Sequence, residues 1–385
     1  MSLISAYRSV FTACLAAFVL APAPCAAQSE IARVRVAPLE GSTGVTLAKI
    51  IEADLSFSGA LLLAPQDQEA VVISGSVTGL RLEGIMTEPS GRELMRTMYD
   101  GLDLRRAAHE FADDIVFALT GEPGIATSRI AFVSDQSGRP EIYVCEGDGR
   151  EKRRVTYDGS LAAHPSLDRT GSLLTYTSYR SGFAEIFTLD LLSGKRKNAL
   201  SWPGTASGAA LSPDGRHLAL CASSKGWPQL AVAPLGGGEP FFFPPVGRDA
   251  VPSSPAWSPD GSRLVFTCEI PDGAGPQLFE AKVGRRRATR MMLGTANAFS
   301  PDWSPNGQRL VFTTGQGGDQ RLAVRDITSG QTRLLTQGRE PCWGASGRHV
   351  LFSTGDRLVI VNVDNNQEKV LIENFGRLSE PSWTK

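Results

Sequence analysis

The sequence has almost no excess of charge of either sign. Its 39 lysines and arginines are balanced by 40 aspartates and glutamates, which gives a formal net charge of −1. Proteins that bind nucleic acid or anionic membranes usually carry a basic surface, so this balance argues against a nucleic-acid partner. Hydrophobic residues make up 42% and charged residues 21% of the 385 positions, as in ordinary globular proteins with room for two domains.

The chain also lacks the patterns that carry catalysis or bind metals. It has no H-E-x-x-H motif, no G-x-S-x-G nucleophile elbow, no Walker loop and no dinucleotide fingerprint. The six cysteines show no C-x-x-C spacing. We therefore expect no catalytic residue, no metal site and no cofactor. Four cysteines are expected to be buried free thiols, with disulfides as the alternative: Cys145, Cys221, Cys268 and Cys342.

Long apolar runs are absent beyond the start of the chain. There, Arg8 precedes a short apolar run at 9–20 and an alanine- and proline-rich segment at 21–27. This order is typical of a secretory signal peptide, and the run is too short to span a bilayer. We expect cleavage near Ala27. A buried helix and a lipidated Cys25 are the alternatives.

A repeat dominates the second half of the sequence. Each unit has a short strand, a turn ending in glycine and a second strand of alternating apolar residues. The units span 164–178, 208–223, 254–269, 300–315 and 340–355. The turn glycines are 44, 46, 46 and 40 residues apart: Gly171, Gly215, Gly261, Gly307 and Gly347. This period is typical of four-stranded propeller blades.

Two features of the repeat predict its local structure. Three dipeptides predict tight hairpins in which both residues take positive φ: Asp214-Gly215, Asp260-Gly261 and Asn306-Gly307. A tryptophan recurs in the first strand, where its ring is expected to fill the wedge between blades. A carbohydrate-stacking platform is the alternative for these rings: Trp257, Trp303, Trp343 and Trp383.

Further strands complete six blades. A third strand follows in each unit, at 141–145, 185–189, 229–233, 277–281, 321–325 and 357–361. A polar fourth strand, for example at 152–157 and 331–336, suits an outer edge. The first unit begins at its second strand (128–135), and a P-x-W strand (380–384) stands alone. We expect this lone strand to pair into the first blade and close the ring.

The segment before the propeller has no such repeat. Strands are predicted at 33–40, 60–65, 70–77, 80–88 and 93–101, and helices at 46–59 and 102–124. The second helix has an apolar stripe formed by Leu104, Ala108, Phe111, Ile115 and Leu119, and Gly121 and Pro123 are expected to end it. The expected fold is a small N-terminal α/β domain followed by an all-β six-bladed β-propeller. The expected bounds are 1–27 for the signal peptide, 28–123 for the α/β domain and 124–385 for the propeller.

The repeats and the front segment resemble the TolB family of periplasmic propeller proteins. P-x-W-S-P-D-G, L-x-F-x-S and E-I-Y-V are similar to TolB-like repeats, which several peptidase propellers share. EADLSFSGALLLAP (52–65) and AHEFADDIVFALTGEPGIATSRIAFVSD (108–135) resemble the front domain and the junction of that family. The resemblance covers the whole chain after the signal peptide. Departures from W-S-P-D-G occur at LDRTG in blade two, at Leu211 and at Gly344-Ala345-Ser346.

The resemblance implies a non-enzymatic scaffold in the periplasm. TolB proteins bind the peptidoglycan-associated lipoprotein Pal through the propeller and the inner-membrane protein TolA through the N-terminal region. The system supports outer-membrane integrity and envelope constriction during cell division. A monomer that reaches membranes only through its partners is expected. The alternatives are a propeller that binds a small molecule or glycan in its channel, and a peptidase-related propeller, which needs a further catalytic domain.

The loops that lead into the innermost strands are the expected partner-binding surface. These loops cluster around one mouth of a propeller channel, and loops on a rigid scaffold commonly bind partners. The candidates form a mixed polar set: His164, Thr205, Asp249, Asn297, Arg339, Glu340 and Glu380. For each residue taken singly, a solvated turn is the alternative.

Two other groups of polar residues are interpreted as ordinary surface. His217 and His349 follow hairpin glycines, so we expect both on the surface. A run of arginines at the approach to an outer strand is interpreted as a solvated edge, with an anion or membrane patch as the alternative: Arg285, Arg286, Arg287 and Arg290.

Overall fold

The computed structural model describes residues 31–385 except 102, 201–203, 224–225 and 272–274. The predicted signal peptide therefore lies outside the described residues. The first sheet has five strands in the order β2-β1-β3-β4-β5. Their bounds are β1 (Arg33–Val36), β2 (Leu62–Leu63), β3 (Val71–Thr78), β4 (Arg81–Thr87) and β5 (Glu93–Asp100). β1 is parallel to β2 and β3, whereas β3, β4 and β5 form an antiparallel meander.

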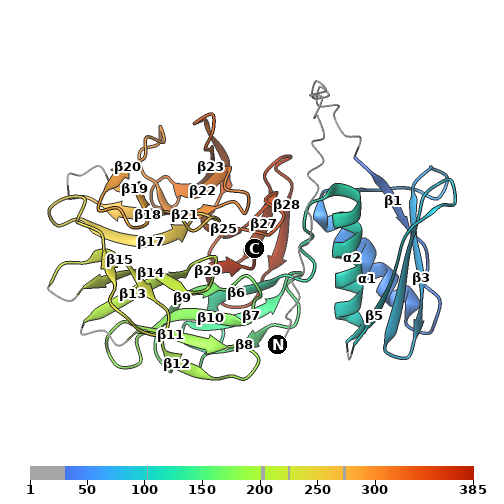
Figure 1. Ribbon diagram of the computed structural model, residues 1–385, viewed down its shortest axis with the longest axis horizontal. Coiled ribbons are helices and arrows are strands. Elements are labelled where there is room, and N and C mark those ends of the chain that lie inside the picture. The colour runs from blue at the N-terminus through green and yellow to red at the C-terminus, as the bar shows by residue number, and fades with distance from the viewer. Residues whose placement is uncertain (1–30, 102, 201–203, 224–225, 272–274) are drawn as a thin grey trace, which may run out of the picture. The chain divides into compact units, whose positions relative to one another are not determined.

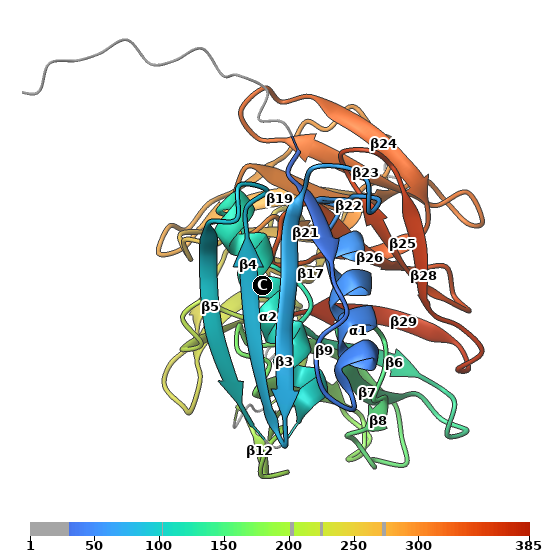
Figure 2. The ribbon, with the colours of Figure 1, turned by 90° about the vertical axis from the view of Figure 1, so that its right-hand side faces the viewer.

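Two helices lie side by side on one face of this sheet (Figure 2). They are α1 (Gly44–Ser58) and α2 (Leu104–Thr120). The predicted apolar stripe of α2 is confirmed, because Ala108, Phe111 and Ile115 are fully buried. Leu104 and Leu119, at the two ends of the stripe, pack against the same core. This core holds the α/β region together.

The ends of two elements differ from the predicted ones. α2 is shorter than 102–124, because Asp103 caps its start by accepting the N–H groups of Arg105 and Arg106. Its other end agrees with the prediction, because Gly121 ends the helix with a φ of 73°. β1 stops at Val36 rather than continuing to residue 40, since Pro38 has no N–H to donate to the sheet.

Six four-stranded antiparallel sheets follow one another around a ring (Figure 1). The inner strands, in blade order, are β29 (Leu378–Trp383), β9 (Ala162–Leu167), β13 (Thr205–Leu211), β17 (Val251–Trp257), β21 (Phe299–Trp303) and β25 (Arg339–Trp343). The second strands are β6 (Arg129–Ser134), β10 (Leu173–Ser178), β14 (His217–Ser223), β18 (Arg263–Glu269), β22 (Arg309–Thr314) and β26 (His349–Ser353).

The third and outer strands complete each blade. The third strands are β7 (Glu141–Glu146), β11 (Glu185–Asp190), β15 (Gln229–Pro234), β19 (Pro276–Lys282), β23 (Arg321–Asp326) and β27 (Leu358–Asn362). The outer strands are β8 (Arg153–Arg154), β12 (Arg196–Asn198), β16 (Phe241–Phe242), β20 (Ala288–Arg290), β24 (Thr332–Gln337) and β28 (Glu368–Ile372). All six predicted third strands are confirmed.

The antiparallel order gives the ring two distinct faces. The hairpin between the inner and second strands, and the loop between the third and outer strands, lie at one end of each blade, which we call the hairpin face. The loop between the second and third strands, and the link from each outer strand to the next blade, lie at the other end, which we call the link face.

The ring closes as predicted. β29 pairs antiparallel with β6, with Leu378 opposite Ser134 and Trp383 opposite Ile130 (Figure 1). The first blade therefore combines β6, β7 and β8 with the chain's last strand. Each inner strand contacts the next around the ring, and β29 contacts both β25 and β9.

The repeated tryptophans pack between blades, as predicted. Four of them are buried: Trp257, Trp303, Trp343 and Trp383. The indole N–H of Trp257 donates to the carbonyl oxygen of Ala210 on the preceding blade at 3.0 Å. Trp343 makes the matching bond to the carbonyl oxygen of Asp302 at 3.2 Å. Because the rings are enclosed in these seams, they offer no platform for a sugar.

The hairpins between inner and second strands differ from the prediction. Only the glycine of each pair has positive φ, for example Gly261 at 68°. The loop is longer than two residues, because the Ser258 N–H closes it on the carbonyl oxygen of Arg263. Asp260 instead accepts hydrogen bonds from the Ser258 and Ser262 hydroxyls, which lower its pKa to about 2.

Two expectations about single side chains have different outcomes. The prediction that His349 lies on the surface is wrong: it is 3% exposed, because the ring of Phe57 on α1 covers it at 5.7 Å. The prediction of free thiols is confirmed for Cys145, Cys221, Cys268 and Cys342, of which Cys221 is half-buried and the other three are buried. Burial raises their pKa, to about 12 for Cys221 and about 11 for Cys268.

Candidate functional site

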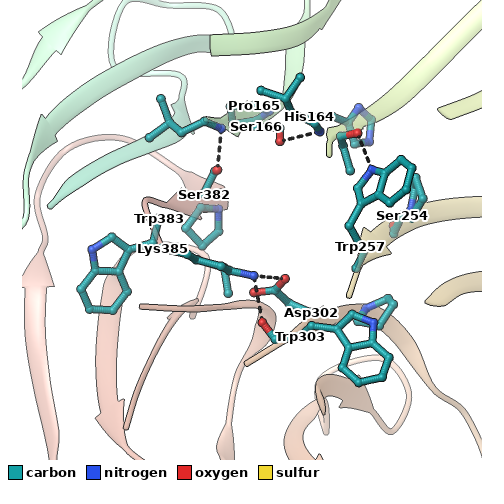
Figure 3. Close-up of a pocket in the computed structure, with 18 of the residues that line it drawn as sticks. His164, Pro165, Ser166, Ser254, Trp257, Asp302, Trp303, Ser382, Trp383 and Lys385 are labelled. Carbon is teal, nitrogen blue, oxygen red and sulfur yellow. Dashed lines mark hydrogen bonds and ion pairs between the residues drawn. The ribbon is translucent and has the colours of Figure 1, made fainter. Parts of the chain in front are cut away.

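The six inner strands surround a cavity of about 280 Å³ in the ring channel (Figure 3). Each strand contributes the same few positions, so the lining repeats from blade to blade. Residues around this opening include His164, Ser254, Asp302, Trp303, Ser382 and Lys385. The residues that line the cavity come from the inner strands and from the hairpins that follow them.

Every inner strand carries an irregularity at one equivalent position. The register of pairing shifts there in all six blades. The residue at the shift has φ between 46° and 63° in each blade: His164, Gly208, Ser254, Ser300, Glu340 and Glu380. Five of the nine non-glycine residues with positive φ in the described chain occupy this position. Such backbone is costly and persists only when its surroundings fix it.

Threonine hydroxyls fix this backbone in three blades. The N–H of Gly208 donates to the hydroxyl of Thr177 at 3.1 Å, on the second strand of the preceding blade. Ser300 and Glu340 make the same bond, to Thr267 at 3.0 Å and Thr313 at 3.1 Å. Each bond ties one blade to the next at the wall of the channel.

Carboxylates replace the hydroxyl where the ring closes. At the aligned position of β6 the chain has Val133, which offers no acceptor. The N–H of His164 instead donates to the carboxylate of Glu380 at 2.5 Å. The N–H of Glu380 in turn donates to the carboxylate of Glu340 at 2.7 Å. Two acidic side chains, Glu340 and Glu380, therefore lie next to each other in the channel wall where the last blade meets the first.

These carboxylates give that side of the channel its electrostatic character. Burial raises the pKa of Glu340, and the nearby charge of Glu380 raises it further. The imidazole of His164 lies 3.8 Å from Glu380, and the guanidinium of Arg339 lies 3.9 Å from Glu340. The charge of Arg339 therefore offsets part of the negative charge of the two acids.

A second group of polar side chains lies two residues further along three of the six inner strands: Ser166, Asp302 and Ser382. The Ser382 hydroxyl accepts the N–H of Leu167 at 3.1 Å, and Asp302 accepts the N–H of Trp343 at 2.7 Å. Lys385 reaches across to Asp302 at 2.5 Å and to the carbonyl oxygen of Trp303 (Figure 3). Asp302 and Ser382 were not among the residues predicted from the sequence, although each is the middle residue of a P-x-W strand and lines the channel.

The structure brings together only part of the predicted partner-binding set. His164, Glu340 and Glu380 line the cavity, and Arg339 lies beside them. Thr205 begins β13, while Asp249 and Asn297 each precede an inner strand by two residues. These three therefore lie at the link face, several residues away from the level of the cavity. The role of the whole set in binding stays a prediction.

The described part of the chain gives no sign of a metal centre or of a membrane span. Within it, no three histidine, cysteine or acidic side chains are grouped so as to hold a metal ion. None of its helices has the length and apolar character needed to cross a bilayer.

Comparison with known proteins gives consistent matches. A family model described as "TolB beta propeller domain" matches residues 117–385. The Tol-Pal system protein TolB of Bordetella parapertussis is 27% identical over 379 residues, covering 90% of this chain and 85% of that protein. A TolB homolog of Chlorobium chlorochromatii is 29% identical over 200 residues, covering 50% of this chain and 44% of that protein.

Solved structures share the fold. TolB from Acinetobacter baumannii has a TM-score of 0.80 at 22% identity, covering 92% of this chain and 97% of that chain. A putative TolB from Agrobacterium tumefaciens has a TM-score of 0.51 at 19% identity, covering 65% and 90% respectively. The α/β region followed by a six-bladed ring is thus an architecture that this chain has in common with a known structure.

Proposed function

The chain belongs to the TolB β-propeller family, and from this we propose that it is a periplasmic, non-enzymatic scaffold of the Tol-Pal system. In this role it binds the lipoprotein Pal through the propeller and TolA through its N-terminal region. It thereby supports outer-membrane integrity and envelope constriction during cell division. Its signal peptide is removed near Ala27, and residues 28–123 and 124–385 act as two domains.

Exposed aromatic side chains on the link face support this proposal best. Three of them are Tyr157 at 71%, Phe183 at 67% and Trp227 at 61% exposure. Tyr157 lies in the link from β8 to β9, and the other two lie in loops between second and third strands. Tyrosine and tryptophan are among the residues that most often dominate protein interfaces.

The polar candidates complete this surface. Thr205, Asp249 and Asn297 belong to the same face, so a partner that covers the aromatic side chains also meets these groups. This combination of aromatic anchors and a polar rim is typical of protein interfaces. We therefore place the Pal site on the link face, across the first four blades.

A ligand in the channel is the weaker alternative. The cavity of about 280 Å³ is below the usual size of pockets that enclose small molecules. Its buried acceptors also already receive backbone N–H groups of the neighbouring blades. We therefore favour a protein-binding surface on the link face over a ligand site in the channel.

Calorimetry with the periplasmic domain of Pal tests the placement. The triple variant Tyr157→Ser, Phe183→Ser, Trp227→Ser should bind at least about tenfold more weakly than the wild type. Leu192→Ser is the matched control, because Leu192 is 95% exposed in the hairpin-face loop between β11 and β12. Unchanged affinity of a folded triple variant would remove Pal from this face. Failure to recover Pal and TolA in a pull-down from solubilised envelopes would count against the scaffold itself.

A further inference from the structure

An uncompensated group of cations lies on the fourth blade. We call it the arginine edge; it runs along the end of β19, the loop that follows and β20. Its five members are all exposed: Lys282, Arg285, Arg286, Arg287 and Arg290. Within the described residues none of them forms an ion pair. The acidic residue of the same hairpin, Glu280, is already paired with Arg263 at 3.1 Å.

The local fold keeps these side chains in solvent. The loop after β19 is held at the hairpin face by the Val283 N–H, which donates to the carbonyl oxygen of Ser262 at 2.9 Å. Gly284 turns the chain with a φ of 77°. β20 is the outermost strand of its sheet, so it pairs with β19 alone. Arg286 lies over the ring of Phe241 at 5.8 Å, which anchors one arginine to the neighbouring blade.

Apolar side chains accompany the cations. Met292, two residues after β20, is 80% exposed, and Val283 within the loop is 37% exposed. A soluble acidic segment would be attracted by the charges alone and would leave these apolar groups unused. Surfaces that bind the interface of a bilayer combine basic side chains, which meet anionic headgroups, with apolar groups that enter the acyl boundary.

We propose that the arginine edge binds directly to the surface of an anionic phospholipid bilayer. The net charge of −1 hides this site, because opposite charges elsewhere on the molecule cancel the local excess. The run of arginines is then a membrane patch rather than the solvated edge expected from the sequence. This function goes beyond the scaffold role, since it needs neither Pal nor TolA. The arginine edge also begins at the hairpin face, whereas the proposed Pal site lies on the link face.

Vesicle sedimentation tests the proposal on the processed, purified protein. Vesicles of phosphatidylethanolamine with about one third phosphatidylglycerol should bind the wild type at low salt, and added salt should release it. Vesicles of phosphatidylcholine alone should not bind it. Reversal of three charges, Arg285→Glu, Arg287→Glu and Arg290→Glu, should weaken binding at least about tenfold. This variant keeps Arg286 on the Phe241 ring, which protects the fold.

A matched control separates the patch from net charge. Arg180→Glu, Arg216→Glu and Arg377→Glu change the net charge equally at exposed and scattered positions, so binding should stay within about twofold of the wild type. Met292→Ser should weaken binding about threefold. Absence of binding to anionic vesicles, or equal losses in the two triple variants, would overturn the proposal. Patch-dependent capture of polyglutamate without vesicle binding would assign the edge to an acidic protein instead. Pal affinity should be unchanged in the variant Arg285→Glu, Arg287→Glu, Arg290→Glu.

Discussion

Burial changes the chemistry of single residues in this protein, and His349 on β26 is the clearest case. It is 3% exposed, beneath the ring of Phe57. Burial lowers the pKa of its imidazole to about 4, with a smaller contribution from Arg348 that Asp364 opposes. The folded protein therefore keeps His349 neutral at pH values at which the unfolded chain binds a proton.

Acid should destabilise the wild type more than a variant that lacks this imidazole. As pH falls from the ordinary value of 6.5 toward 4, the wild type should lose stability relative to His349→Gln. The loss should reach roughly 3 kcal/mol in the free energy of unfolding. Urea titrations of both proteins at several pH values measure this loss. The difference in the free energy of unfolding at neutral pH gives the effect of the substitution on packing, which does not depend on pH. Parallel curves for the two proteins would mean that folded His349 takes up a proton normally.

The channel residues show what sequence can reveal about single positions. His164, Glu340 and Glu380 could be picked out because each lies where a loop leads into an inner strand. Their positive φ could not be, since a residue before proline is expected to be extended. That the carboxylates of Glu340 and Glu380 accept backbone N–H groups could not be predicted either, because this depends on which side chain the neighbouring blade offers at the same level. Val133 explains only the bond from His164 to Glu380, and only once the ring is closed; at the level of Glu380 the neighbouring blade offers Ser353, whose hydroxyl donates instead to the carbonyl oxygen of Leu378.

Between elements, close packing decides what the α/β region tolerates. Gly84 on β4 faces α2 so closely that a Cβ there would lie 2.6 Å from the ring of Phe111. Phe111 is fully buried and has no room to move aside. A glycine inside a strand, which normally weakens it, here allows the helix to approach the sheet.

Gly84→Ala should therefore destabilise the protein by about 2 kcal/mol through overpacking. Gly318→Ala is the control, because a Cβ at Gly318 meets nothing within 4 Å. Thermal unfolding of both variants measures the difference. Equal melting temperatures would show that α2 shifts away from β4 without cost.

The sequence predicted the number and kind of these elements better than their ends. Alternating and helical periodicity identified the strands of both regions and the buried stripe of α2. The ends depend on single capping groups, such as Asp103 and Gly121, and on Pro38 in β1. The hairpin loops of the propeller are longer than the predicted two-residue turns. The serine and aspartate side chains of S-P-D-G form hydrogen bonds within the loop and stabilise this longer form.

On the scale of the whole molecule, ring closure holds six otherwise open blades together. β29 supplies the inner strand of the first blade, and the indole of its Trp383 donates to Ser128 at 2.7 Å. The period of the repeat and the lone P-x-W strand were enough to predict this closure. The position of the α/β region could not be predicted, because no periodic pattern links Phe57 to His349.

Deletion of residues 380–385 should lower the melting temperature of the whole propeller by more than about 10 °C. The first blade would lose its inner strand and the seams on both sides of it would open. Lys385→Ala is the control, since it removes only the bonds to Asp302 and Trp303. Calorimetry compares the two. A truncated protein that melts with the wild type would show that five blades hold the ring without closure.

The same closure sets an order of events during folding. The N–H of Arg129 meets the hydroxyl of Thr384, a partner 255 positions away. Contacts of such long range form slowly, because the chain loses much entropy before they stabilise anything. Until β29 arrives, β6 presents an unpaired edge to every neighbouring chain. In a compartment that receives the polypeptide from its amino end, the first blade to emerge is thus the last to be finished, with β6 open to other chains in that interval.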